Sequence, residues 1–107
     1  MSGRVEWRPK IAGETVLRYA DFTDELAAGE TVSSGTCVLT VWSGDDPSPP
    51  EATATVIENT AGLDAVLEVQ IPGGVTGTIY SALCSATTSA SRVYQKGAYL
   101  AIVPQTP

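Results

Sequence analysis

Alternation of apolar and polar residues, the pattern of a half-buried β-strand, is the main signal along this chain. It is clearest in residues 65–71, where every second residue from Ala65 to Ile71 is apolar and would point to one side. Similar short stretches recur between turns that are rich in glycine and proline. The strands that this pattern predicts cover residues 15–19, 31–42, 52–57, 65–71, 78–86 and 94–103.

Two irregular features interrupt this series. Residues 21–29 suit a single helical turn, with Asp21 or Thr23 as its N-terminal cap and Gly29 as its stop. Gly35, inside the second expected strand, indicates a bulge. About seven short strands without intervening helices are typical of an all-β fold, an immunoglobulin-like sandwich of two antiparallel β-sheets.

The pattern divides the chain of 107 residues into three parts. We expect an N-terminal docking arm over 1–12, the β-sandwich over 13–104 and a frayed tail over 105–107. The inward strand positions give the expected core, which comprises Leu17, Cys37, Leu39, Val41, Val56, Leu67, Val69, Tyr80, Ala82, Cys84, Leu100 and Ile102.

The two cysteines fall on strands that face each other across an immunoglobulin core. Cys37 lies on the second expected strand and Cys84 on the penultimate one. The pair has two interpretations: a disulfide between the sheets, formed after release into an oxidising medium, or two buried thiols that pack as small hydrophobic groups. The second is favoured, because a protein that folds in a cytoplasm cannot form the bridge there.

Charge is distributed unevenly along the chain, whose net charge is −6. Residues 19–91 contain no Lys or Arg, and all twelve acidic residues except Glu6 and Glu14 lie there. Such an acidic middle disfavours binding to nucleic acid or to anionic membranes. The basic residues near the two ends are either a contact for an acidic partner surface or simply a solvated face.

The sequence contains neither a secretory signal nor a run of about 18 apolar residues that would span a membrane. We therefore expect the protein to be made in a cytoplasm, and to leave it only by lysis or assembly.

No group of residues predicts catalysis. The chain has no histidine, which excludes Ser-His-Asp and Cys-His sites and histidine-based metal sites. Asp45, Asp46 and Glu51 lack the spacing of a calcium loop, and the acids of residues 21–25 are explained by capping a helical turn. We expect no catalytic residue, no cofactor and no metal, and hence a protein that is not an enzyme.

Two tryptophans are the best candidates for partner contacts. Trp7 lies beside Arg8 and close to Arg4, and Trp and Arg are enriched at interface hot spots. The alternative is that Trp7 folds back on its own core. Trp42 has the opposite strand parity to Cys37, so we expect it on an outer face or at an edge. The partner-contact candidates are Arg4, Trp7, Arg8 and Trp42.

Residues 9–103 resemble small virion structural proteins of tailed bacteriophages. That family has a proline before the first strand, an Asp-aromatic segment, a Gly-acidic-Thr turn, and an alternating strand that ends in Gly-Gly before Gly-Thr-x-Tyr. The matching residues are Pro9, Leu17–Tyr19, Asp21-Phe22, Leu26, Gly29–Thr31, Ser33-Ser34, Ala65–Ile71, Gly73-Gly74, Gly77–Tyr80 and Ser85–Val103.

This resemblance implies an immunoglobulin-like subunit on the virion, a homo-oligomer or a protein present in many copies, made in the host cytoplasm. It would act through contacts with other virion proteins of the capsid, neck or tail. Capsid decoration, the head–tail connector and tail fiber attachment are all compatible with it. An alternative is a module that binds host-surface glycans, for which the argument is fold analogy alone.

Overall fold

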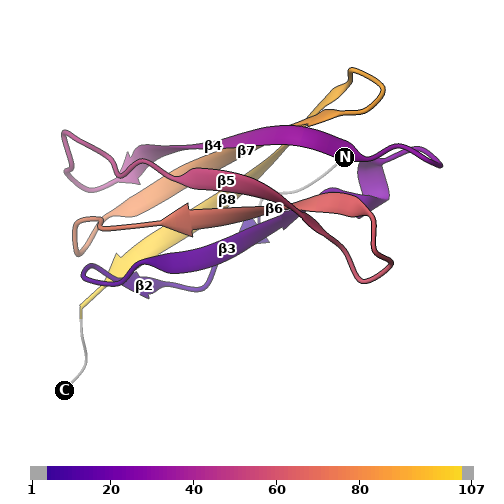
Figure 1. The fold of residues 1–107 in the computed structure, drawn as a ribbon. Coiled ribbons are helices and arrows are strands. Elements are labelled where there is room, and N and C mark those ends of the chain that lie inside the picture. Colours follow the sequence, from indigo (N-terminus) through magenta and orange to yellow (C-terminus); the bar gives the residue numbers. More distant parts are fainter. Residues whose placement is uncertain (1–4, 105–107) are drawn as a thin grey trace.

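The computed structural model, which describes residues 5–104, consists of two β-sheets packed face to face (Figure 1). The larger sheet has the order β1-β8-β7-β4, with β2 also paired to β8, and the smaller has the order β3-β6-β5. One short 3₁₀ turn, η1, spans Thr23–Glu25. The strands are β1 (Val5–Glu6), β2 (Lys10–Ile11), β3 (Val16–Asp21), β4 (Val32–Ser43), β5 (Thr53–Glu58), β6 (Asp64–Ile71), β7 (Ile79–Thr88) and β8 (Val93–Val103).

The prediction of an immunoglobulin-like β-sandwich is confirmed. If β1 and β2 are counted as one interrupted strand, seven strands form the two sheets. Strands β4, β7 and β8 correspond to the C-F-G sheet of an immunoglobulin domain, and β3, β6 and β5 correspond to B-E-D. One detail differs from an all-antiparallel sandwich, because β1 and β2 pair with β8 in the parallel direction.

The core follows the strand alternation in most of the sandwich. Ala65, Leu67, Val69 and Ile71 of β6 are all fully buried, as the pattern predicts. The prediction for β3 is wrong: Leu17 is 44% exposed, and the alternate residues, including Ala20, face inward. Val41 and Val56 are only half-buried and pack at the border of the core.

The two irregular features also differ from expectation. The helical turn contracts to η1, where the Asp21 carboxylate accepts hydrogen bonds from the Thr23 backbone N–H (2.9 Å) and hydroxyl (2.5 Å). The register of β4 against β7 shifts near Ser33 and Trp42 rather than at Gly35. Gly35 instead permits close packing: a Cβ atom there would lie 2.6 Å from Leu67 Cδ1 and closer still to Cδ2.

Residues 5–11 close one side of the sandwich and are part of the fold. The Trp7 backbone N–H donates to the Tyr99 carbonyl of β8 (2.9 Å), and its indole Nε1–H donates to the Tyr19 carbonyl of β3 (3.2 Å). Trp7 therefore links the two sheets and is only 8% exposed. Within the docking arm expected over 1–12, residues 5–11 pair with β8 and pack on the sandwich. Residues 1–4 and the expected tail at 105–107 lie outside the described residues.

Lys10 fixes β2 in this position. Its side chain is buried, and its ammonium donates hydrogen bonds to the carbonyls of Ile11 (3.0 Å), Ala12 (3.4 Å) and Gly73. Burial lowers the pKa of Lys10, while the carbonyls replace part of the water that the charge loses. The hydrogen bond from Lys10 to Gly73 joins β2 to the turn that follows β6.

The proline-rich loop over residues 44–52 lies on the opposite side of the sandwich. Pro49 and Pro50 lie beside Val38 and Leu39, with which they line a hollow next to β4. Proline has no N–H group to donate, so this loop disfavours the addition of a further strand there. Assembly through the free side of β4 is therefore disfavoured.

Tyr80 anchors this loop to the turn before β7. Its hydroxyl donates to the Asp46 carboxylate (2.6 Å) and accepts a hydrogen bond from the Val75 backbone N–H (3.0 Å). The bond to an N–H five residues upstream resembles the tyrosine corner of immunoglobulin domains. Burial, together with the bond to Asp46, raises the pKa of Tyr80 and keeps the hydroxyl protonated.

A buried carboxylate stabilises the start of β4. Glu30 accepts hydrogen bonds from the Thr88 hydroxyl (2.5 Å) and the Ala27 backbone N–H (2.8 Å), and Arg92 lies 3.9 Å away. These interactions lower the pKa of Glu30 below its ordinary value of 4.5. The pKa of the folded state is thus below that of the unfolded chain, so this carboxylate stabilises the fold above pH 4.5 and loses its effect as the pH falls through the lowered value.

We predict that Glu30→Gln reduces the loss of stability between about pH 6 and about pH 3. Urea unfolding of both proteins at several pH values measures this difference. The control is Glu58→Gln, because Glu58 is exposed at the end of β5. The free energy of unfolding of Glu58→Gln should fall with pH as it does in the wild type. If that of Glu30→Gln falls just as steeply, Glu30 does not couple folding to pH.

Candidate protein-contact surface

The outer face of the larger sheet carries no charged residue on its three long strands. Its side chains occupy alternate positions from Ser34 to Trp42 in β4, from Ile79 to Thr87 in β7 and from Val93 to Val103 in β8. All sixteen positions are exposed or half-buried. A protein surface with about a quarter of charged residues would place about four charges there. We call this surface the uncharged face.

Apolar side chains project from the uncharged face between rows of Ser and Thr. Val38 and Leu83 lie opposite each other on β4 and β7, and both are exposed. Val93 and Trp42 project near opposite ends of the face. Exposed apolar groups in this arrangement, with no charge among them, are typical of a surface that a partner covers.

The outer face of the smaller sheet provides a contrast. It also presents large exposed side chains, including Tyr19, but it carries the carboxylates of Asp21 and Glu68 as well. The lack of charge is therefore specific to the outward positions of β4, β7 and β8, and the charged side chains of Glu6 and Arg8 lie beside them at one edge.

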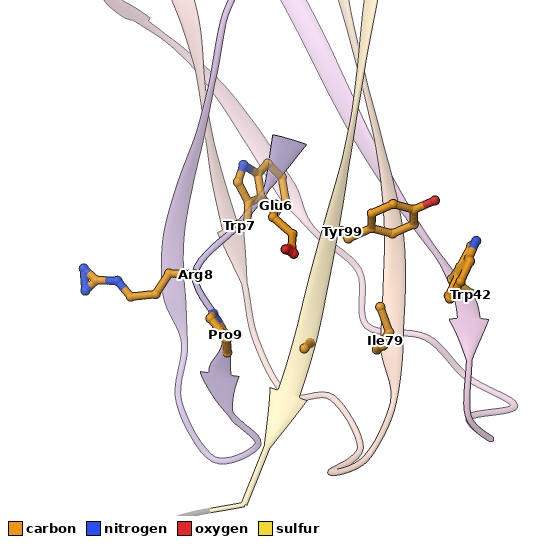
Figure 2. Close-up of a pocket in the computed structure, with 8 residues that line it drawn as sticks. Glu6, Trp7, Arg8, Pro9, Trp42, Ile79 and Tyr99 are labelled. Atoms are coloured by element: carbon orange, nitrogen blue, oxygen red, sulfur yellow. The ribbon is translucent and has the colours of Figure 1, made fainter. Parts of the chain in front are cut away.

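A groove of about 440 Å³ opens at one end of the uncharged face (Figure 2). Ile79 and Ala101 lie in it, residues 6–9 line one side, and the rings of Trp42 and Tyr99 line the other. The two rings meet edge to face, with centroids 5.2 Å apart and planes at 66°. The register shift between Val41 and Ser43 places Trp42 next to Ser43 on this side of the sheet, where it is 60% exposed.

The structure brings together three of the four predicted contact residues. Trp7, Arg8 and Trp42 all line the groove, although Trp42 is far from the other two in the sequence. Trp7 takes part mainly as a buried link between the sheets, and Figure 2 shows the Arg8 side chain extending away from Trp42. Arg4 lies outside the described residues.

Sequence reasoning missed the other five groove residues, which are Glu6, Pro9, Ile79, Tyr99 and Ala101. The parity of β8 was available as a signal for Tyr99, because Leu100 and its inward neighbours leave Tyr99 on the other face. The position of Pro9 could not be found this way, since residues 5–11 show no alternation.

Cys37 and Cys84 are buried neighbours in one sheet rather than residues on opposite sheets. They lie directly opposite each other on β4 and β7, with their sulfur atoms 3.2 Å apart and the thiols free. The expected position across the sandwich is wrong, because the chain forms the additional segments β1 and β2 before β3, so Cys37 falls on the third strand rather than the second. The hydrogen bond to Cys37, together with burial, raises the pKa of the Cys84 thiol.

The carboxylates of the acidic loops, among the residues that the structure describes, do not form a metal site. Within residues 5–104, no three Cys, Asp or Glu side chains are grouped closely enough to hold a metal ion. The Asp46 carboxylate already accepts hydrogen bonds from Tyr80 and from the Ser48 backbone N–H. In the same range, no helix has the length and apolar character to cross a membrane.

Exposed apolar and aromatic side chains on a surface without charges are typical of protein–protein interfaces. A protein-family model described as podophage GP4 fiber-tail adaptor protein gp77 matches residues 10–101. The chain is thus a structural protein of a tailed-phage virion, as the sequence resemblance predicted. It belongs to the family of the podophage GP4 fiber-tail adaptor protein gp77. Comparisons with curated proteins and with solved structures gave no match.

Proposed function

We propose that this protein is a non-enzymatic adaptor, present in many copies, that joins a tail fiber to the phage tail through protein–protein contacts. The family description supports a position at the junction of fiber and tail rather than on the capsid or at the neck. The observation that carries the proposal is the uncharged face with its groove. Synthesis in the host cytoplasm agrees with the two free thiols.

The groove supplies the features of an interface hot spot. Trp42 is a large, exposed aromatic group that rests against Tyr99, so little side-chain freedom remains to be lost when a partner covers it. The neighbouring Ser and Thr residues can hydrogen-bond to a partner without the cost of desolvating a charge. A partner virion protein that inserts an apolar side chain beside Trp42 gains both contributions.

We predict that Trp42→Ser prevents stable incorporation into virions while the domain stays folded. Loss of a hot-spot tryptophan costs about 2 kcal/mol or more of binding free energy, or about a 30-fold loss of affinity. The measurement is the amount of adaptor on particles purified after complementing a phage that lacks its own copy of the gene.

Tyr19→Ser is the matched control, because Tyr19 is an aromatic residue 50% exposed on the outer face of the smaller sheet. We expect it to incorporate normally. If Trp42→Ser and the wild-type protein are incorporated equally, the groove is not part of the contact surface.

The same two rings support a second candidate function, binding of host-surface glycans. Exposed aromatic rings can pack against the apolar faces of sugars, and Trp42 and Tyr99 line one groove. A glycan array probed with the isolated domain tests this function. Specific binding that Trp42→Ser abolishes would favour it over a purely structural role.

A further inference from the structure

We propose that the uncharged face binds a second copy of this chain, so that two adaptors pack face to face around a two-fold axis. This inference rests on the proposed function only in treating the uncharged face as a contact surface. It names the occupant of the centre of that surface, around Leu83, and leaves the groove beside Trp42 at one end to the partner virion protein.

The distribution of charge favours a second copy as the occupant. In a two-fold contact, residues near the axis meet the same residues of the other copy, so any charge there would meet a like charge. The chain has a net charge of −6, and the outward positions of β4, β7 and β8 carry none of it. Contact through the smaller sheet would instead bring carboxylates such as Glu68 of the two copies together.

The centre of the face has a shape that suits a two-fold axis. Leu83 is the middle outward residue of β7, the strand between β4 and β8. Val38 lies opposite it on β4 and Gly97 lies opposite it on β8. Because Gly97 has no side chain, we expect room beside Leu83 for Leu83 of the second copy.

The size of the face is adequate for a dimer. The nine residues of β4 from Ser34 to Trp42 at about 3.3 Å each, and three strands about 4.8 Å apart, give a face of about 430 Å² in projection. Stable interfaces bury about 800 Å² of accessible surface per partner. Side chains make accessible area larger than projected area, so the two values agree in order of magnitude.

Cross-linking tests the contact between copies directly. Residues beside a two-fold axis face their own copies, and the inter-sheet disulfide of immunoglobulin domains shows that facing cysteines of two packed sheets can be joined. We expect Leu83→Cys to form a disulfide-linked dimer under mild oxidation and to revert with reductant. Thr55→Cys, on the outer face of the smaller sheet, is the matched control and should remain monomeric on a denaturing gel. The wild-type protein is the second control, because its two cysteines are buried.

Sedimentation equilibrium of the full chain provides an independent measurement. The wild-type protein should show a dimer that dissociates on dilution, whereas Leu83→Glu should be monomeric with a melting temperature close to that of the wild type. Thr55→Glu should dimerise as the wild type does. The inference is overturned if the wild type is monomeric at every concentration, if Leu83→Glu still dimerises, or if Thr55→Cys cross-links as well as Leu83→Cys.

These outcomes separate the dimer from the adaptor function. A monomeric wild type together with failure of Trp42→Ser to enter virions would mean that another virion protein covers the face. If the wild type dimerises and Trp42→Ser enters virions normally, the dimer is supported and the groove is not the contact to the tail or fiber.

Discussion

Trp7→Ala is expected to lower the free energy of unfolding by about 3–5 kcal/mol, the usual cost of removing a buried tryptophan. The Trp7 side chain belongs to the core, and its indole N–H bonds to β3 while its backbone N–H bonds to β8. Its loss leaves a cavity and an unpaired carbonyl between the two sheets. Urea unfolding of the purified domain measures the change.

Two variants locate the source of this effect. Trp7→Phe keeps an aromatic ring but removes the hydrogen bond to Tyr19, so its cost should be intermediate. Trp42→Ala removes a tryptophan from the surface, and its cost should stay below about 1 kcal/mol. A Trp7→Ala protein as stable as Trp42→Ala would restore the hypothesis that Trp7 is a docking anchor rather than a core residue.

Gly35→Ala is the second substitution for which we expect a large effect, a loss of about 1–3 kcal/mol. Alanine is normally better than glycine inside a strand by about 0.5–1 kcal/mol. Here the added methyl group would lie 2.6 Å from a methyl group of Leu67, which is fully buried and cannot move into solvent. Overpacking therefore outweighs the gain in strand propensity.

A double-mutant cycle isolates this contact. Leu67→Ala alone should cost about 2–5 kcal/mol, because it creates a cavity. In the Gly35→Ala/Leu67→Ala double variant, the new methyl group occupies part of that cavity. The double variant should therefore be more stable than the sum of the single effects predicts, by about 0.5–3 kcal/mol. Additive losses would show that Gly35 and Leu67 do not pack against each other.

Alternation and turn residues were sufficient to predict the six longer strands, but not the beginning of the fold. In β6, strong alternation sets the inward face. In β3, Arg18 shares a side with Val16 and Ala20, so the pattern favours the opposite side as inward, whereas in the structure the Arg18 guanidinium donates hydrogen bonds to the carbonyls of residues 8 and 9. The register of β3 against β6 decides which side faces inward.

The first strand segment was missed because it is too short and irregular to produce a pattern. The segments β1 and β2 contain two residues each and are separated by residues 7–9, which include Trp7 and Pro9. Long-range hydrogen bonds to β8 and β3 hold them in place. This omission moved Cys37 by one strand and produced the incorrect position across the sandwich.

The contact surface was only partly visible in the sequence. The outward parity of Trp42 predicted an exposed aromatic residue, and the structure places it there. The uncharged face could not be recognised, because it combines alternate residues of β4, β7 and β8. These become neighbours only through strand pairing, and Lys96, the one charged residue in these three strands, points to the other side of the sheet.

The lack of charge on this face has a consequence for a particle that moves between environments. The concentration of dissolved ions falls or rises when a virion leaves a lysed cell, and ions screen attraction between exposed opposite charges over about 8 Å at physiological ionic strength. A junction made by apolar groups and by neutral hydroxyls contains no such attraction to screen. The affinity of an adaptor bound through the uncharged face would therefore change little between low and high salt concentration.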